Sequence, residues 1–254
     1  MNLDRAEALQ RRGLHDWVSL LASSSPDARP FERDGVIASI VPSCPKRSIC
    51  NSVAYGDPAA LAGALDELAG VYERAGIAAW TVWAPGFDGD GIAALEAAGH
   101  RLDGSPTAMS LALDAFEPLE PGDLDWDDQA EPAVLGRLND LAYALPDGAG
   151  VAPALAAPPR LPDLRLYQAR VEGEPACALG TLDHGGDLGV YFVATHPGRR
   201  GLGLASRLMS VALVAGRERG LRTSSLQASP MGRPVYVTLG YAEDFPMGMY
   251  ERRR

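Results

Sequence analysis

The chain has 254 residues, of which 46% are hydrophobic, and this suits one large or two ordinary globular domains with a substantial core. The formal net charge of -10 argues against a broad cationic surface for nucleic acid and permits a cationic substrate such as an amine. No apolar run reaches the roughly 18 residues of a membrane span, so no membrane partner is expected.

The start of the chain and the cysteines indicate a compartment. Residues 1–7 lack the basic and then apolar profile of a secretory signal. Cys44, Cys50 and Cys177 lack the spacing of paired metal ligands, so we expect reduced, mostly buried thiols and no metal site. These features together predict a cytoplasmic protein.

The first part of the chain predicts alternating helices and strands. An amphipathic pattern over residues 4–22 predicts the first helix. The elements expected next are strands at 36–41 and 51–55, a helix at 57–75, a strand at 79–83, a helix at 91–98 and a strand at 107–113. Trp80 and Trp83 alternate on one strand face, and we expect them in the core rather than against a ligand.

A segment rich in acid and proline predicts a domain boundary. Residues 116–131 hold seven carboxylates and two prolines, which divides the chain into domains 1–118 and 119–254. After it we expect a helix at 131–144, a Pro-rich stretch at 146–162, strands at 164–171, 176–182 and 187–195, a helix at 203–219, a strand at 222–227, a helix at 232–239 and a strand at 245–250.

Both parts end in the same order of helix, strand, short helix and strand, and a glycine closes each helix. Placing Gly99 on Gly240 aligns Leu-Glu-Ala-Ala-Gly-His with Tyr-Val-Thr-Leu-Gly-Tyr. This agreement predicts a duplicated α/β domain, with chance agreement of common α/β elements as the alternative.

The strongest local signal lies in residues 193–205, where a strand ends, a glycine-bearing turn follows and a helix begins. Such a corner points unpaired backbone N–H groups and the positive end of a helix dipole at one spot, which favours phosphate. Gly201 and Gly203 allow close approach, and Arg199 and Arg200 add countercharge.

Three alternative interpretations of this corner can be compared with the sequence. A P-loop would end in Gly-Lys-Ser/Thr, which is absent. A dinucleotide fingerprint would need a third glycine near Ser206, an earlier place in the fold and an acidic residue about 20 positions on, and none of these fits. A plain strand–turn–helix corner without a ligand is the remaining alternative.

The sequence Arg-Gly-Leu-Gly-Leu-Ala at 200–205 resembles the Arg/Gln-x-x-Gly-x-Gly/Ala signature of the GNAT superfamily of N-acetyltransferases. Pro-Val-Tyr-Val-Thr-Leu-Gly-Tyr at 234–241 is similar to that family's Leu-Tyr-x-x-x-Gly-Phe element. The resemblance covers residues 119–254. It implies an α/β (α+β) fold of two GNAT-like domains, each a mixed, mostly antiparallel sheet flanked by helices. The first would be a degenerate copy without the cofactor motif.

The resemblance further implies acetyl-CoA as cosubstrate, held in a slot between two splayed parallel strands at 187–195 and 222–227. An amide near Val193 would stabilise the thioester oxygen as it gains charge. Ser229 stands where the family often has an asparagine seven residues before the tyrosine. The residues expected to bind the cosubstrate are Val193, Ala194, Thr195, Arg199, Arg200, Gly201, Leu202, Gly203, Leu204, Ala205 and Ser229.

Aminolysis of a thioester needs a neutral amine and a proton for the departing thiolate. Tyr236 is the candidate general acid, with a packed core tyrosine as the alternative. Asp187 is the candidate base, and Asp183 and His184 in the same turn are further candidates, with a solvated turn as the alternative for each. Leu95 stands in the first part where Tyr236 stands in the second, so we expect no catalysis there.

These features predict an acyl-CoA-dependent N-acyltransferase that moves acetyl from acetyl-CoA to a primary amine by direct attack in a ternary complex. The acceptor is expected to be a small-molecule amine or a peptide N-terminus, and a homodimer is compatible with the sequence. Two other functions stay open. They are an acyl-CoA-binding sensor without turnover and a scaffold for protein contacts.

Overall fold

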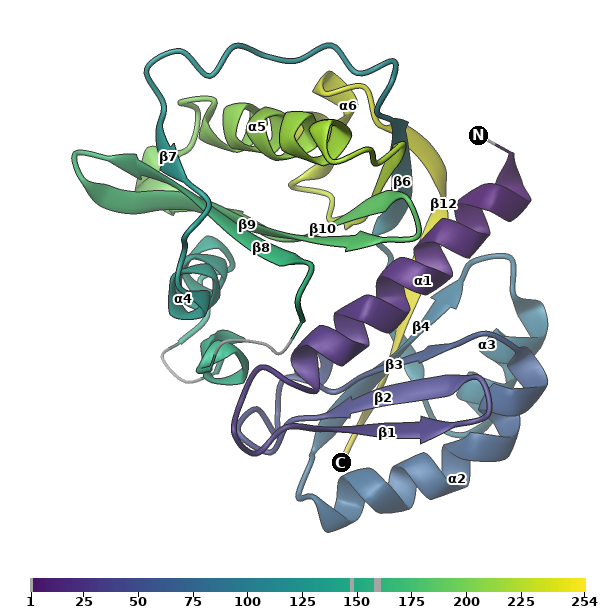
Figure 1. Ribbon diagram of the computed structural model, residues 1–254. Helices are drawn as coiled ribbons and strands as arrows, with labels where there is room; N and C mark the ends of the chain where they lie inside the picture. Colours follow the sequence, from purple (N-terminus) through teal and green to yellow (C-terminus); the bar gives the residue numbers. More distant parts are fainter. Residues whose placement is uncertain (1, 147–148, 158–160) are drawn as a thin grey trace.

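The computed structural model describes residues 2–146, 149–157 and 161–254, which fold into helices and strands (Figure 1). The elements of residues 2–118, here called the N-terminal half, are α1 (Leu3–Leu21), β1 (Arg29–Arg33), β2 (Val36–Ile40), η1 (Ser48–Cys50), β3 (Ser52–Tyr55), α2 (Pro58–Arg74), β4 (Ala79–Pro85), α3 (Gly89–Ala97), β5 (Arg101–Gly104) and β6 (Thr107–Ala112).

Residues 119–254, here called the C-terminal half, contain the remaining elements. They are β7 (Asp125–Asp127), α4 (Pro132–Ala142), η2 (Ala152–Leu155), β8 (Leu164–Val171), β9 (Glu174–His184), β10 (Asp187–Thr195), η3 (Pro197–Arg199), α5 (Leu204–Glu218), β11 (Thr223–Ala228), α6 (Arg233–Thr238) and β12 (Ala242–Arg253). The stretch predicted to be Pro-rich and irregular, 146–162, lies partly outside the described residues.

The described strands form one sheet in the order β1-β2-β3-β4-β12-β6-β11-β10-β9-β8-β7, with β5 beside β12. The pairs β3–β4 and β10–β11 are parallel. The other pairs between neighbours in this order are antiparallel. The expected mixed, mostly antiparallel α/β fold with flanking helices is confirmed. Within the described ranges, no helix combines the length and the apolar character needed to cross a membrane.

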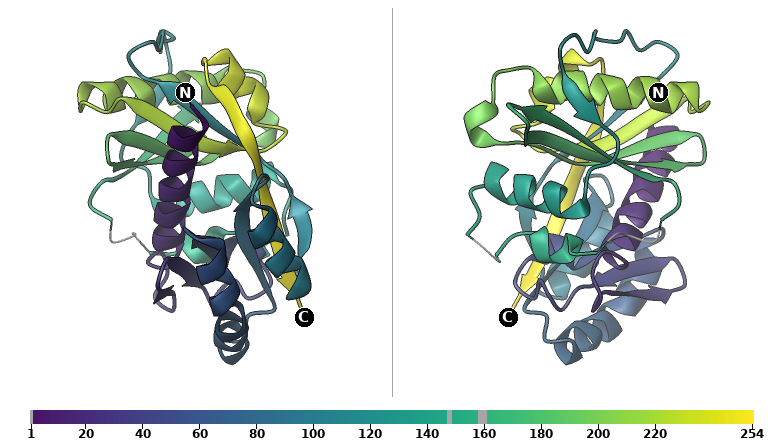
Figure 2. Two further views of the ribbon diagram at one scale, coloured as in Figure 1. Left: turned by 90° about the vertical axis from the view of Figure 1, so that its right-hand side faces the viewer. Right: turned by 60° about the vertical axis from the view of Figure 1, so that its left-hand side comes forward.

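The last strands of the two halves are exchanged. β6 of the N-terminal half pairs with β11 of the C-terminal half. β12 pairs with β6 over 242–246 and then with β4 over 247–253. Figure 2 shows β12 as the yellow strand that runs from the C-terminal half into the N-terminal half. The predicted boundary at 118/119 falls between β6 and β7, and the sheet is continuous across it.

The helices form where sequence signals and burial agree. Asp57 caps α2 by accepting a hydrogen bond from the Ala60 N–H at 2.9 Å, and Pro58 occupies the first turn, where its missing N–H does no harm. Gly76, with φ 73°, follows the helix. The buried stripe recurs at helical spacing and consists of Leu61, Ala64, Leu65, Leu68 and Tyr72.

Helix α1 lies between the two halves (Figure 1). It contacts β2 and β3 on one side and β9, β10 and β11 on the other. Trp17 stacks on Tyr191 at 5.8 Å between ring centroids and packs against Phe192 at 4.7 Å. The Tyr191 hydroxyl donates to the Gly13 carbonyl at 2.9 Å. This helix and its apolar cluster therefore fix the N-terminal half against β10 of the C-terminal half.

Candidate active site

Strands β10 and β11 separate from each other part-way along their length. Both strands are fully described, and their parallel pairing runs from Asp187 opposite Thr223 to Gly189 opposite Ser225 and no further. Beyond Gly189, β10 continues with β9 as its partner. The splayed slot that the sequence predicted between these strands is confirmed.

A bulge lies in β10 at the mouth of this slot. The register with β9 shifts between Tyr191, opposite Gly180, and Ala194, opposite Ala178. Phe192 inside the bulge has a φ of 54°, a left-handed value that is uncommon without glycine and that gathers at functional sites. A bulge takes backbone groups out of the ladder, so it presents them to the slot.

The glycine corner follows directly after β10 and η3. Gly201 and Gly203 have φ values of 80° and 70°, which glycine adopts without strain. Gly203 is the N-cap of α5, and no described side chain caps the helix there. A Cβ built on either glycine meets no atom within 4 Å. The first turn of α5 therefore keeps its amides open toward free space, as an anion site requires.

The two arginines of this corner differ in their partners. Arg199 Nη2 lies 2.5 Å from the Glu172 carboxylate, which neutralises it. Arg200 Nη2 donates to the Ala142 carbonyl at 2.7 Å and, among the described residues, has no carboxylate partner. Arg200 is therefore the better placed of the two to supply countercharge to a bound anion.

One cavity of about 660 Å³ connects the corner with the slot. Most residues predicted from the sequence line it, namely Val193, Ala194, Thr195, Arg199, Arg200, Gly201, Gly203, Leu204, Ala205, Ser229 and Tyr236. Two predicted residues, Leu202 and Asp187, are not among the described residues that line it, and Leu202 is 51% exposed to solvent instead.

Residues 144–241 match the profile of the Acetyltransferase (GNAT) family. The chain carries a GNAT acetyltransferase domain. A search of curated proteins found no match to the chain.

Solved structures resemble the whole chain. A GCN5-related N-acetyltransferase from Kribbella flavida has a TM-score of 0.65 at 16% identity, covering 98% of this chain and 95% of that one. A functionally unknown conserved protein from Staphylococcus epidermidis scores 0.62 at 14% identity, covering 90% and 95%. A tandem GNAT protein from the clavulanic acid biosynthesis pathway scores 0.56 at 16% identity, covering 95% of each chain. At such identities the likeness establishes the fold alone.

Tyr236 of the GNAT domain lies on α6 and is 7% exposed. A Cβ built on Gly232 would lie 3.0 Å from this ring and 3.4 Å from its hydroxyl, and 3.5 Å from Ser229 Oγ. Gly232 therefore leaves room for the tyrosine beside Ser229. Burial raises the pKa of Tyr236 above its usual range, so the hydroxyl keeps its proton at neutral pH.

Asp187 lies at the far end of β10 from the bulge and is fully buried. Its Oδ2 accepts a hydrogen bond from Ser225 Oγ at 2.6 Å and lies 3.2 Å from His184 Nε2. Its position does not support the expected role of proton acceptor for a substrate in the cavity, and the physical reason is its enclosure between β9, β11 and α1.

The other two base candidates are also held by protein groups. His184 Nδ1 lies 2.6 Å from Asp16 Oδ2 of α1. Asp183 pairs with Arg219, whose Nε lies 2.7 Å from Oδ2. Neither belongs to the described lining of the cavity. Both side chains at the end of β9 are thus engaged in ion pairs with other parts of the chain.

The N-terminal half supplies one wall of the GNAT domain's cavity, which sequence reasoning missed. Trp17, Arg47 and Trp83 line it. Trp83 belongs to the buried core, as expected, and also borders the cavity. Among the described lining residues there are three arginines and no aspartate, glutamate or histidine. The cavity is therefore electropositive within a chain whose net charge is -10. No local sequence signal distinguishes these three residues from ordinary core or surface positions.

Proposed function

We propose that the protein is an N-acetyltransferase that transfers the acetyl group of acetyl-CoA to a primary amine. The observation that carries the proposal is the cavity itself, which joins the uncapped N-terminus of α5, the splayed strands β10 and β11 and the protonated Tyr236. The family match supports acyl transfer in general. The acetyl group, the amine and the direct route are our proposal.

The residues present fit acetyl-CoA. The open amides after Gly203, with Arg200 beside them, would hold the diphosphate. The backbone of β10 beyond Gly189 lacks β11 as a partner, so it would pair with the amide-containing pantetheine arm as an added strand does. When bound, acetyl-CoA supplies a thioester whose C–S bond is exchanged for a C–N bond to the amine.

Two groups of the chain would assist this exchange. The bulge at Phe192 and Val193 offers backbone N–H groups to the carbonyl oxygen as it gains negative charge. Tyr236 would donate its hydroxyl proton to the departing sulfur and later regain one from solvent. Because the described lining contains no carboxylate or histidine, the amine would give up its own proton to water.

The Tyr236→Phe variant tests this proposal most directly. Loss of the proton donor should lower kcat by about 100-fold or more while the affinity for acetyl-CoA changes little. Release of free thiol measures turnover, and isothermal titration calorimetry measures binding. The matched control is Tyr72→Phe, a buried tyrosine of the N-terminal half whose hydroxyl bonds the Ser39 carbonyl far from the cavity lining.

The outcomes separate the functions considered. Equal turnover of Tyr236→Phe and the wild type would remove the acid role. Binding of acetyl-CoA without turnover of any amine would favour the sensor function. No binding of acetyl-CoA by the wild-type protein at millimolar concentration would contradict both and leave the scaffold.

A further inference from the structure

One end of the cavity is built by the N-terminal half and faces the bulge of β10. We propose that this end binds an acceptor amine that also carries a carboxylate, with Arg47 as the carboxylate-binding residue and the indoles of Trp17 and Trp83 as an apolar wall. This inference rests on the proposed function and names the acceptor class for the same site.

Arg47 has a fixed backbone, and its side chain has no partner in the part of the chain that the structure describes. Its N–H donates to the Cys44 carbonyl at 3.2 Å, and its carbonyl accepts from the Cys50 N–H at 3.1 Å and from Asn51 Nδ2 at 3.3 Å. Among the described residues no carboxylate pairs with its guanidinium, and its Nε is buried without a hydrogen-bond partner. A buried donor left unpaired destabilises the protein, and a bound anion would recover this cost.

The guanidinium suits a carboxylate in particular. It presents parallel N–H groups in a planar fork that matches the two oxygens of a carboxylate. The diphosphate of the cosubstrate already has the open turn of α5 and Arg200. Arg47 comes from the opposite half of the chain, beside η1, so it is available to the acceptor.

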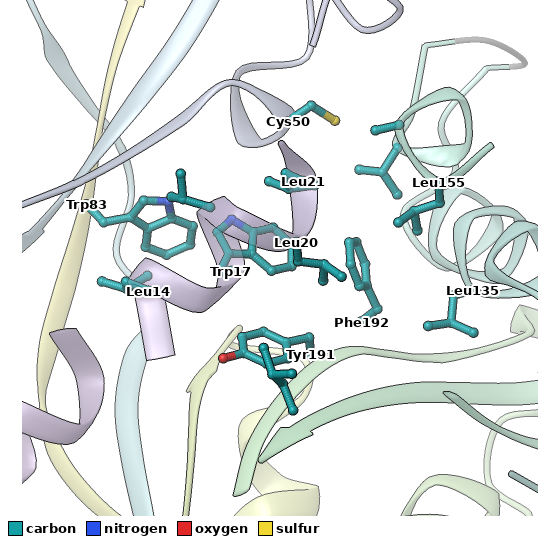
Figure 3. Close-up of a cluster of buried hydrophobic side chains, with 14 of the residues drawn as sticks. Leu14, Trp17, Leu20, Leu21, Cys50, Trp83, Leu135, Leu155, Tyr191 and Phe192 are labelled. Carbon is teal, nitrogen blue, oxygen red and sulfur yellow. The ribbon is translucent and has the colours of Figure 1, made fainter. Parts of the chain in front are cut away.

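The indole wall determines the rest of the acceptor. Trp17 Nε1 and Trp83 Nε1 both donate to Ser52 Oγ, at 3.3 and 3.0 Å. Their N–H groups are thereby used, and the rings offer only apolar surface to the cavity. Figure 3 shows the two indoles near each other and Trp17 beside Phe192 of the bulge. An aliphatic or aromatic side group would fit this wall within reach of the reacting centre.

The charge of the cavity agrees with such an acceptor. Arg199 is paired with Glu172, whereas Arg47 has no carboxylate partner among the described residues. An acceptor that carries a carboxylate would therefore gain an ion pair with Arg47 that an amine without an acidic group would lack.

The test compares matched substrates in the wild type and in Arg47→Gln. The probes are leucine, phenylalanine and tryptophan, each with its neutral carboxamide, and thiol release gives kcat/KM. We expect the wild type to prefer the carboxylates. The ratio of carboxylate to amide kcat/KM should fall at least 10-fold in Arg47→Gln, mainly through KM. Comparing ratios cancels the different intrinsic reactivity of the two amines.

Three further measurements test this interpretation. Arg33→Gln, which removes a surface arginine paired with Glu67 at 2.7 Å in the same half, should leave the ratio unchanged. Binding of N-acetyl-L-phenylalanine in the presence of CoA should weaken at least 10-fold in Arg47→Gln, whereas the Kd of acetyl-CoA should stay within about twofold. Arg47→Lys should give an intermediate ratio, because it keeps the charge without the fork.

Several results would overturn the inference. An unchanged ratio in Arg47→Gln would do so, as would a tenfold weaker Kd for acetyl-CoA, which would assign Arg47 to the cosubstrate. Acetylation of amines without a carboxylate, together with no use or binding of the carboxylate probes, would refute it while the proposed function stands. Failure to bind acetyl-CoA at all would instead refute the proposed function.

Discussion

The two halves build the same strand-to-helix corner and finish it differently. In the N-terminal half, β3 leads into α2, and Asp57 closes the helix by accepting from the Ala60 N–H at 2.9 Å. In the C-terminal half, β10 leads through η3 into α5, and Gly203 leaves the helix without a side-chain cap from any described residue. The Asp57 carboxylate thus occupies the anion site at the N-terminus of α2, whereas the equivalent site at the N-terminus of α5 is open to a ligand.

The short helices that follow differ in the same sense. Leu95 of α3 is fully buried and belongs to the core of the N-terminal half. Tyr236 of α6 lines the cavity with a hydroxyl that keeps its proton. The two halves share an order of elements and therefore a scaffold. They differ at the helix cap, Asp57 against Gly203, and on the short helix, Leu95 against Tyr236, and the proposed function depends on these differences.

The largest expected effect comes from placing an acidic cap, like that of α2, at the N-terminus of α5. In Gly203→Asp, the carboxylate would occupy the first-turn amides of α5 and repel a diphosphate, so the affinity for acetyl-CoA should fall about 100-fold or more. Aspartate tolerates the left-handed conformation better than most residues, so the fold should survive. Isothermal titration calorimetry measures the Kd.

The matched control uses the other end of the same helix. Gly220 follows α5 with a φ of 89°, and a Cβ built there meets no atom within 4 Å. Gly220→Asp therefore carries the same substitution and backbone strain and should leave the Kd unchanged. If Gly203→Asp binds acetyl-CoA as the wild type does, the corner is not the diphosphate site.

A second prediction concerns the ion pairs that join the halves. Burial alone would lower the pKa of His184, but Asp16 and Asp187 raise it to about 9 from 6.5. Because the folded-state pKa is the higher one, this stabilisation is complete below about pH 6.5 and is lost as the pH rises through 9. Burial alone would raise the pKa of Asp16, but His15 and His184 lower it to about 2 from 3.8, so its stabilisation is lost only as the pH falls through 2.

The variant His184→Asn isolates this contribution. It should lower the free energy of unfolding by roughly 3 kcal/mol near neutral pH, because it leaves the carboxylates of Asp16 and Asp187 without their cation. Urea denaturation at about pH 6 and about pH 10 should show a smaller alkaline loss in the variant than in the wild type. Equal losses would mean that His184 does not carry a proton in the folded protein.

The smallest expected effect comes from removing the Asp57 cap of α2. Asp57→Ala should lower stability by about 1 kcal/mol and the melting temperature by a few degrees, and Asp57→Ser should restore most of this. The Kd of acetyl-CoA should not change in either variant. A change of the Kd would show that the N-terminal corner communicates with the cavity, contrary to the comparison above.

Local sequence patterns predicted much of the fold and of the candidate site. The strands at 164–171 and 187–195 have the predicted bounds, and most other elements agree within a few residues. The glycine corner and Tyr236 were found because their residue types and spacing lie within single short segments. β1 and β7 gave no such signal, since both are short and mostly exposed at the edges of the sheet.

What the sequence could not predict depends on contacts between distant segments. Asp187 follows a polar turn and so suggested exposure, but it is buried and pairs with His184 of β9, which in turn pairs with Asp16 of α1. Arg47 and Trp83 reach the cavity because α1 and the exchanged strands bring the halves together. Hydrophobic periodicity reports the face that a strand buries and does not report the strand that lies next to it.

The shared strand β12 has a consequence for biosynthesis. Strand β4 of the N-terminal half has β3 and β12 as its neighbours, so one of its edges lacks a partner until residues 242–253 have left the ribosome. An open strand edge invites pairing with other chains, and closing it late requires a long chain loop to be ordered. Nascent copies of this protein are therefore most exposed to misassociation and to chaperones while the N-terminal half has been made but β12 has not yet joined its sheet.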